Sequence, residues 1–179
     1  MEPGACDLAV VGAGIIGLAV ARELVERHPA LTIRVFEREA EVGAHQTAHN
    51  SGVVHAGIYY APGSLKVRLC VEGARLLYEH CERHGISHER CGKLIVATDR
   101  SELAALDELE RRGIANAVPG LRRVDADGIR ELEPHASGLA ALHSPATGIV
   151  DFAAVARSLA DELRERGSKR RDGECDSLA

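Results

Sequence analysis

The sequence predicts an α/β fold in which a strand–helix–strand unit is followed by part of a second, mixed-sheet domain. The apolar run Leu8–Val11 is typical of a strand buried on both faces, and it leads directly into the glycine-rich residues 12–17. Residues 15–28 separate apolar and polar side chains onto two helical faces, and Pro29 ends this pattern. Residues 31–37 alternate as a second strand does and finish on an acid.

The composition is that of one packed domain. The 179 residues are 45% hydrophobic, and with two Phe, three Tyr and no Trp the core must be aliphatic. The net charge is -5 and the basic residues are scattered, so we expect no nucleic-acid partner. No apolar run approaches the roughly 20 residues that span a bilayer, and the N-terminus lacks the basic region of a signal peptide. We expect a cytoplasmic protein, with a peripheral position at the inner face of the membrane as the alternative.

The five cysteines contain no CxxC pair, which argues against both a disulfide framework and a zinc site. His80 and His84 lie one helical turn apart, but Cys81 follows the first histidine where the zinc motif HExxH needs a glutamate. We therefore expect no metal, and a solvated helix end at these histidines. Cys70 and Cys81 are expected to be buried free thiols.

The glycines of residues 12–17 match the dinucleotide-binding pattern GxGxxG in the context that it needs, between a strand and a helix. Gly12 permits a tight turn, Gly14 lets the backbone approach a pyrophosphate, and Gly17 lets helix and strand pack closely. The helix N-terminus offers free amides to the phosphates. Glu37, twenty residues beyond Gly17, is placed to bind the ribose hydroxyls. The motif predicts a Rossmann-like domain, with NAD or FAD as the ligand.

The rest of the chain predicts elements around a functional loop. Residues 38–63 are too long for a simple connection and lack a sustained period, so we expect them to carry function. Ser64 caps an amphipathic helix that Gly85 ends. The further predicted elements are strands over 92–98, 139–143 and 148–150, a helix over 101–112 ended by Gly113, a short helix over 125–133, and a helix capped by Asp151 over 152–166 and ended by Gly167. Residues 168–179 are expected to form a disordered tail.

Longer motifs run through nearly the whole chain and are more specific than the glycines. They are Glu37-Arg38, the loop His49-Asn50-Ser51-Gly52-Val53-Val54-His55-Ala56-Gly57-Ile58-Tyr59-Tyr60, Pro62-Gly63-Ser64-Leu65-Lys66, Leu69-Cys70-Val71-Glu72-Gly73, Cys91-Gly92-Lys93-Leu94-Ile95-Val96-Ala97, Val118-Pro119-Gly120-Leu121 and Thr147-Gly148-Ile149-Val150-Asp151. With these motifs the chain resembles the L-2-hydroxyglutarate dehydrogenase family of FAD-dependent oxidoreductases, which are similar to D-amino acid oxidase. The resemblance covers residues 7–167.

The resemblance implies one FAD-dependent oxidoreductase domain over residues 1–167, with an FAD-binding βαβ unit at 7–37, a flavin loop at 38–63 and partial substrate-domain elements at 85–150. It also implies oxidation of L-2-hydroxyglutarate to 2-oxoglutarate, with electrons passed to a quinone or another acceptor. Flavin N5 can accept the hydride while a protein base takes the hydroxyl proton. The cofactor-binding residues that we expect are Gly12, Gly14, Ile16, Gly17, Glu37, Arg38, Thr47, Asn50, Ser51 and Gly52.

His55 is the candidate for the catalytic base or for a donor that faces the flavin, because the resemblance puts this loop beside the isoalloxazine ring. The alternatives are a histidine that only orients the loop and, as in some relatives, a histidine that carries the flavin covalently. The substrate is a dianion, so Tyr59, Tyr60 and Lys66 are candidates for binding its carboxylates. Packing and solvated surface are the alternative roles of these three side chains.

Members of this family are much longer than 179 residues, and residues 168–179 depart from their pattern. We therefore expect a truncated chain, and two hypotheses follow. The chain is an FAD-dependent 2-hydroxyacid dehydrogenase, or it is a non-catalytic remnant that at most binds nucleotide or associates with another chain through unpaired strands. A third hypothesis, an NAD-linked dehydrogenase, rests on the glycines alone, and the loop after Glu37 disfavours it.

Overall fold

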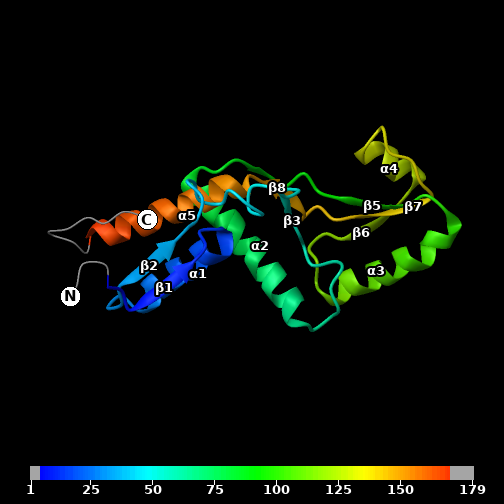
Figure 1. Cartoon of the computed structure of the whole chain (residues 1–179). Coiled ribbons are helices and arrows are strands. Elements are labelled where there is room, and N and C mark those ends of the chain that lie inside the picture. Colours follow the sequence, from blue (N-terminus) through cyan, green and yellow to red (C-terminus); the bar gives the residue numbers. More distant parts are fainter. Residues whose placement is uncertain (1–4, 170–179) are drawn as a thin grey trace. The chain divides into compact units, whose positions relative to one another are not determined.

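The computed structural model describes residues 5–169, with side chains up to Arg166 (Figure 1). The chain forms two compact units. The first comprises the residues up to Ser51 together with those from Asp151 onward, and the second comprises Gly52–Val150. The boundary between the units therefore lies within the predicted flavin loop, residues 38–63.

The first unit contains the predicted strand–helix–strand motif. Strands β1 (Leu8–Val11) and β2 (Ile33–Phe36) pair in parallel, and α1 (Ile15–Arg27) connects them. Helix α5 (Phe152–Lys169) packs on α1, and Arg22 of α1 binds Glu162 of α5 with 2.6 Å between nitrogen and oxygen. The side chains buried in this unit include Leu18, Ala21, Val35, Val155, Ala156, Leu159 and Ala160.

Helix α5 begins as the sequence predicts but ends later. The Oδ1 atom of Asp151 accepts hydrogen bonds from the amides of Ala153 and Ala154 at 2.9 and 3.0 Å, which confirms the predicted cap. The helix continues through Gly167 to Lys169, so the predicted end at Gly167 is wrong. A glycine costs a helix about 1 kcal/mol relative to alanine, which weakens the helix without ending it. The remainder of the predicted tail, 170–179, lies outside the described residues.

The second unit opens with the predicted capped helix. Helix α2 (Leu65–His84) begins at Ser64, whose hydroxyl accepts a hydrogen bond from the amide of Val67. It ends at Gly85, which has a left-handed backbone with φ of 63°. Both boundary predictions are confirmed because each depended on a residue whose chemistry is specific to a helix end.

Two three-stranded sheets form the rest of the second unit. One has the order β3-β8-β4 and the other the order β5-β7-β6, and every pair in them is antiparallel. In this detail the structure differs from the predicted mixed sheet, which needs at least one parallel pair. The strands are β3 (Val53–Val54), β4 (His88–Glu89), β5 (Leu94–Ala97), β6 (Arg122–Asp125), β7 (Ala140–His143) and β8 (Gly148–Val150).

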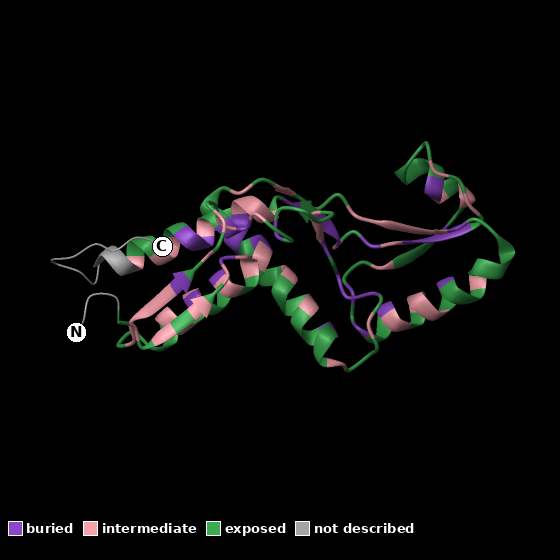
Figure 2. Ribbon diagram, in the orientation of Figure 1, coloured by how far each residue is buried: buried purple, intermediate pink, exposed green. Residues whose placement is uncertain are grey.

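The central strand β7 carries the core of the second sheet, and Figure 2 shows it as a mainly buried ribbon. Helix α3 (Leu103–Ala115), which follows a capped 3-10 turn over Arg100–Glu102, contacts β5 and β7, and the short helix α4 (Ala126–Leu132) contacts β6 and β7. The buried side chains here include Ala97, Leu106, Leu142, Val124 and Ile129.

Helix α3 runs past Gly113, where the sequence predicted its end. This glycine is buried, and a Cβ atom on it would lie 2.2 Å from Cδ2 of Leu121. Gly113 therefore makes room for a packed side chain and does not act as a stop signal. Within residues 5–169, no helix has the length and apolar content that a bilayer crossing requires.

Candidate functional site

The glycine turn between β1 and α1 has the geometry that the sequence predicts. Gly12 has a positive φ of 97°, which favours glycine, and its amide donates to the carbonyl of Phe36 at 2.7 Å. The amide of Gly43 donates to the carbonyl of Ala13 at 2.9 Å, so the long loop returns to the turn. Apart from the two residues next to Gly12 in the chain, no described atom lies within 4 Å of the place where a Cβ on Gly12 would stand. The backbone of the turn is therefore open to a ligand.

Gly17 is required by close packing. A Cβ atom on Gly17 would lie 2.1 Å from the carbonyl oxygen of Gly12 and 3.5 Å from a methyl group of Val10. The absence of a side chain lets the first turn of α1 rest on the end of β1, which confirms the role predicted for this glycine.

Glu37 lies immediately after β2 and binds the glycine turn. One carboxylate oxygen accepts from the amide of Ala13 at 2.6 Å, and the other accepts from the amides of Arg38 and Glu39 at 2.8 and 3.0 Å. The amides of Glu39 and Ala13 are the main reasons that the pKa of Glu37 lies below its usual range. Glu37 is thus an ionised acceptor at the edge of the turn, as a ligand for ribose hydroxyls must be.

Thr47 caps α1 from the loop. Gly14, the residue before the helix, has no side chain to act as a cap, and Oγ1 of Thr47 accepts from the amide of Ile15 at 3.1 Å. Asn50 in turn donates to the carbonyl of Thr47 at 2.7 Å. Ile16 is 78% exposed on the first turn of the helix. The structure therefore brings the glycines, Glu37 and Thr47 together at the N-terminus of α1, where anions bind well.

The remaining residues predicted to bind the cofactor lie further along the loop. The guanidinium of Arg38 bonds Glu39 and His45 at 3.0 and 3.2 Å, so its side chain is held among loop residues. Ser51 is exposed at the end of the first unit. Gly52 begins the second unit with a φ of 70°, and its carbonyl accepts from the amide of Val150 at 2.9 Å.

His55 follows β3 in the second unit, and the residue is exposed although part of its imidazole is covered. The carbonyl of His55 accepts a hydrogen bond from the thiol of Cys70 at 3.2 Å. Partial burial and the positive charge of Lys93 both lower the pKa of the His55 imidazole from its ordinary value. Both effects favour the neutral imidazole, which is the form that can accept a proton.

Lys93 lies beside the same loop and was not among the residues predicted for the site. Its Nζ atom lies 4.7 Å from the centroid of the Tyr59 ring, within the range of a cation–π contact. Lys66, the lysine that the sequence proposed for substrate binding, is exposed in the first turn of α2, and among the described residues it has no hydrogen bond or ion pair. A lysine between a glycine and a run of apolar residues gives no sequence signal for this contact.

Asn116, at the end of α3, is a second residue that sequence reasoning missed. Its Nδ2 atom donates to the carbonyls of Gly57 and Tyr60 at 2.9 and 3.0 Å, and the side chain is 8% exposed. The guanidinium of Arg112 lies 3.5 Å from the carbonyl of Tyr59. The loop that carries Tyr59 and Tyr60 is therefore anchored from α3. A lone asparagine after a helix gives no sequence signal for such a contact.

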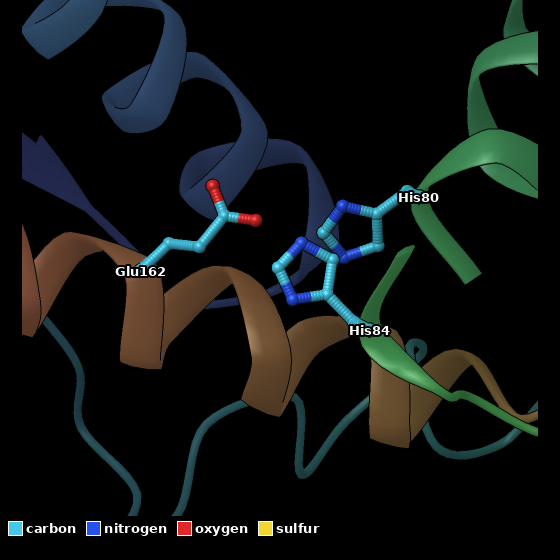
Figure 3. Close-up of side chains that lie close together, drawn as sticks. All are labelled: His80, His84 and Glu162. Atoms are coloured by element: carbon cyan, nitrogen blue, oxygen red, sulfur yellow. The ribbon is translucent and has the colours of Figure 1, made fainter. Parts of the chain in front are cut away.

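The histidines of α2 differ from each other in exposure. Figure 3 shows His80 and His84 one turn apart, and their ring centroids are 4.4 Å apart. His84 is exposed as predicted, but the expectation of a solvated position is wrong for His80, which is 9% exposed. Cys81, the next residue of the helix, is fully buried. Glu162, also drawn in Figure 3, belongs to α5 of the first unit, where it binds Arg22.

The link between Lys93 and His55 predicts a titration result. Replacing Lys93 with methionine removes one of the two causes that lower the pKa of His55, so this pKa is expected to rise toward its ordinary value. The ring protons of His55 report the pKa in an NMR titration. The Lys66→Met variant removes the same charge from an exposed position and should leave the pKa of His55 unchanged. An unchanged pKa in Lys93→Met would show that burial alone perturbs the ring.

Comparisons with known proteins agree with this geometry. Residues 7–179 match the protein family described as FAD dependent oxidoreductase. The mitochondrial L-2-hydroxyglutarate dehydrogenases of Nematostella vectensis and Homo sapiens are 53% and 52% identical to this chain over 161 residues. Each match covers 90% of this chain but only 35% of the relative, so the chain spans about a third of the length of these relatives.

Two solved structures are similar in fold. L-alpha-glycerophosphate oxidase from Mycoplasma pneumoniae, solved with FAD bound, has a TM-score of 0.81 and 26% identity, and the match covers 90% of this chain and 43% of the oxidase. Glycine oxidase from Geobacillus kaustophilus has a TM-score of 0.78 and 25% identity, with 90% and 45% covered. The α/β fold predicted from the sequence is thereby confirmed.

Proposed function

Because this chain belongs to the family of FAD-dependent oxidoreductases, we propose that it binds FAD and supplies the cofactor-binding part of an enzyme that oxidises L-2-hydroxyglutarate to 2-oxoglutarate. The observation that carries the proposal is the Glu37 carboxylate, which lies 2.6 Å from the amide of Ala13 beside the open glycine turn. The substrate is proposed from the relatives, whose names specify this hydroxy acid.

The residues at the N-terminus of α1 fit the adenosine and pyrophosphate half of FAD. The turn at Gly12 leaves its backbone uncovered, and the first amides of α1 favour a phosphate charge. Glu37 is an ionised acceptor for the ribose hydroxyls. Thr47 holds the loop against the start of the helix, because its Oγ1 atom accepts a hydrogen bond from the amide of Ile15 at 3.1 Å.

In the proposed chemistry, a side chain of the protein accepts the proton of the substrate hydroxyl. FAD, when bound, supplies the acceptor for the hydride that leaves the carbinol carbon. His55, whose neutral form is favoured by burial and by the charge of Lys93, takes the hydroxyl proton. The Cys70 thiol, which donates to the carbonyl of His55 at 3.2 Å, helps to hold the backbone that carries this ring. Tyr59 and Tyr60 follow on the same anchored loop and are proposed to face the substrate.

The acceptor of the electrons is proposed to be a quinone or another acceptor. We expect the protein to be cytoplasmic or to lie peripherally at the inner face of the membrane, and this location stays a prediction.

Flavin binding tests the proposal directly. Titrating FAD into the purified 179-residue chain should give saturable binding, seen as quenched flavin fluorescence, whereas NADH should bind far more weakly. Adding L-2-hydroxyglutarate should then bleach the flavin absorption. Acid precipitation should release all of the flavin, and retained colour would indicate covalent attachment at His55. A chain that binds NADH tightly and FAD not at all would contradict the proposal.

A non-catalytic remnant that at most binds nucleotide is the second candidate, and one observation favours it. Among the described residues β1 pairs with β2 alone, and Val11 on β1 is 88% exposed. A strand of a parallel sheet is normally covered on both faces. For this candidate, the titration would show FAD binding while L-2-hydroxyglutarate leaves the flavin absorption unchanged.

A further inference from the structure

Lys93 is a half-buried residue whose ammonium has no acidic partner in the part of the chain whose side chains are described. The other lysine whose side chain is described, Lys66, is exposed. Within residues 5–166, no carboxylate lies within ion-pair distance of Lys93, although most of the arginines described there do pair with acids. An ammonium that no described carboxylate pairs with can bind an anionic ligand without first breaking an ion pair.

The backbone of Lys93 is fixed by the turn between β7 and β8. Its amide donates to the carbonyl of Ser144 at 3.1 Å, and the amide of Ser144 donates back at 2.9 Å. The amide of Gly92 donates to the carbonyl of Thr147 at 2.9 Å, and the buried hydroxyls of Ser144 and Thr147 are 3.1 Å apart. The start of the Lys93 side chain is therefore held as firmly as a residue within a sheet.

The other end of the Lys93 side chain is held by the flavin loop. Its ammonium lies 4.7 Å from the ring centroid of Tyr59, and the loop is anchored through Asn116 and through Ile58, which is 2% exposed. An aromatic face attracts the ammonium without using its three N–H donors. These donors stay free to bind a carboxylate.

The position of Lys93 relative to His55 suits a 2-hydroxy acid. The ammonium of Lys93 lies over the ring of Tyr59, four residues beyond His55 on the same loop, and its positive charge lowers the pKa of the His55 imidazole. In a 2-hydroxy acid the reacting hydroxyl is next to a carboxylate, and an ammonium near the base would bind that carboxylate while the base reaches the hydroxyl.

We propose that Lys93, positioned over the Tyr59 ring, binds a carboxylate of the 2-hydroxy acid, and that Lys66 is a solvated side chain. The identity of the acid rests on the proposed function, whereas the anion site itself rests on the placement of Lys93. Glutarate has both carboxylates of L-2-hydroxyglutarate but no hydroxyl. It therefore tests the anion site without requiring the proposed oxidation.

The test uses calorimetry and NMR on the full chain with FAD present. The sequence contains only three lysines, so dimethylation of their amines, which keeps the charge, gives few and resolvable methyl signals. The signal of Lys93 should shift on addition of glutarate or of L-2-hydroxyglutarate, and that of Lys66 should not. Lys93→Met should weaken the binding of both acids by about 10- to 100-fold, the usual effect of losing a charged hydrogen bond. Lys66→Met should change the affinity for both acids by less than about twofold. Lys93→Arg, which keeps the positive charge, should retain most of the affinity that Lys93→Met loses.

The outcomes separate the two proposals. Equal shifts of Lys93 with both acids, without flavin bleaching, would support the anion site and contradict the proposed oxidation. Ligand binding that leaves the Lys93 signal in place, or that Lys66→Met weakens more than Lys93→Met, would overturn the anion site. Failure of the chain to bind either acid would overturn it too. If Lys93→Met does not fold, the methyl signals of the unaltered sequence still give the answer.

Discussion

Replacing Gly17 with alanine is expected to abolish FAD binding and to destabilise the first unit. The new Cβ atom would lie 2.1 Å from the carbonyl oxygen of Gly12, far inside van der Waals contact. The backbone of Gly12 is held in place because its amide donates a hydrogen bond to the carbonyl of Phe36. The carbonyl oxygen of Gly12 therefore cannot move aside as a flexible side chain can. We expect a loss of about 3 kcal/mol in the free energy of unfolding, at the upper end of overpacking effects. Urea unfolding measures this loss, and quenching of flavin fluorescence measures the affinity for FAD.

Gly73→Ala is the matched control, because it makes the same change in an open position. Gly73 lies within α2, and apart from its chain neighbours and the nearby backbone of its own helix no described atom comes within 4 Å of the place where its Cβ would stand. Alanine should stabilise this helix by about 0.5–1 kcal/mol and leave FAD binding unchanged. Gly17→Ala protein that unfolds like the unaltered chain and binds FAD equally well would show that α1 does not rest on β1 as described.

The parts of the fold that the sequence predicted well depend on local chemistry. The turn at Gly12, the cap at Ser64, the left-handed end at Gly85 and the cap at Asp151 each follow from one residue type in one conformation. Gly113 and Gly167 carried the same local signal, yet both helices pass through them. At Gly113 the deciding factor is the side chain of Leu121, which is packed where a Cβ would stand, and no local pattern reveals it.

The strands that the sequence missed are short and owe their existence to distant partners. β3 and β4 have two residues each, too few to show any period, and both form only because β8 lies between them. β6 contains three charged residues around the buried Val124, so its composition argues against a strand. Pairing with β7 outweighs that preference.

The residues of the candidate site likewise include some that the sequence could predict and some that only the folded structure reveals. Glu37 could be predicted because the dinucleotide motif fixes its spacing from the glycines. Thr47 was predicted as a cofactor residue through the family resemblance, but its cap on α1 could not be predicted because the helix start is far away in the sequence. Lys93 and Asn116 act on a loop that lies on the other side of α2 in the chain, and only the folded structure brings them there.

Replacing Asn116 with alanine is expected to loosen the loop that carries His55, Tyr59 and Tyr60. The change removes both hydrogen bonds from Nδ2 and leaves the carbonyls of Gly57 and Tyr60 without this donor in a largely buried place. Leaving buried acceptors unsatisfied costs about 1–3 kcal/mol each, so we expect a loss of about 3 kcal/mol in the free energy of unfolding. Urea unfolding measures it, and faster amide exchange in residues 57–60 would locate the change.

Two further variants test whether the donor itself matters. Asn116→Asp keeps the shape but turns an oxygen toward the two carbonyls, so it should destabilise the protein at least as much as alanine does. The neighbouring Ala117 has a positive φ of 52°, a conformation that costs a residue with a side chain about 1–2 kcal/mol. Ala117→Gly should therefore leave stability unchanged or raise it slightly, although it alters the same turn. If Asn116→Asp were as stable as the unaltered chain, the loop would be held by the packing of Ile58 and Val118, and the amide would not be its anchor.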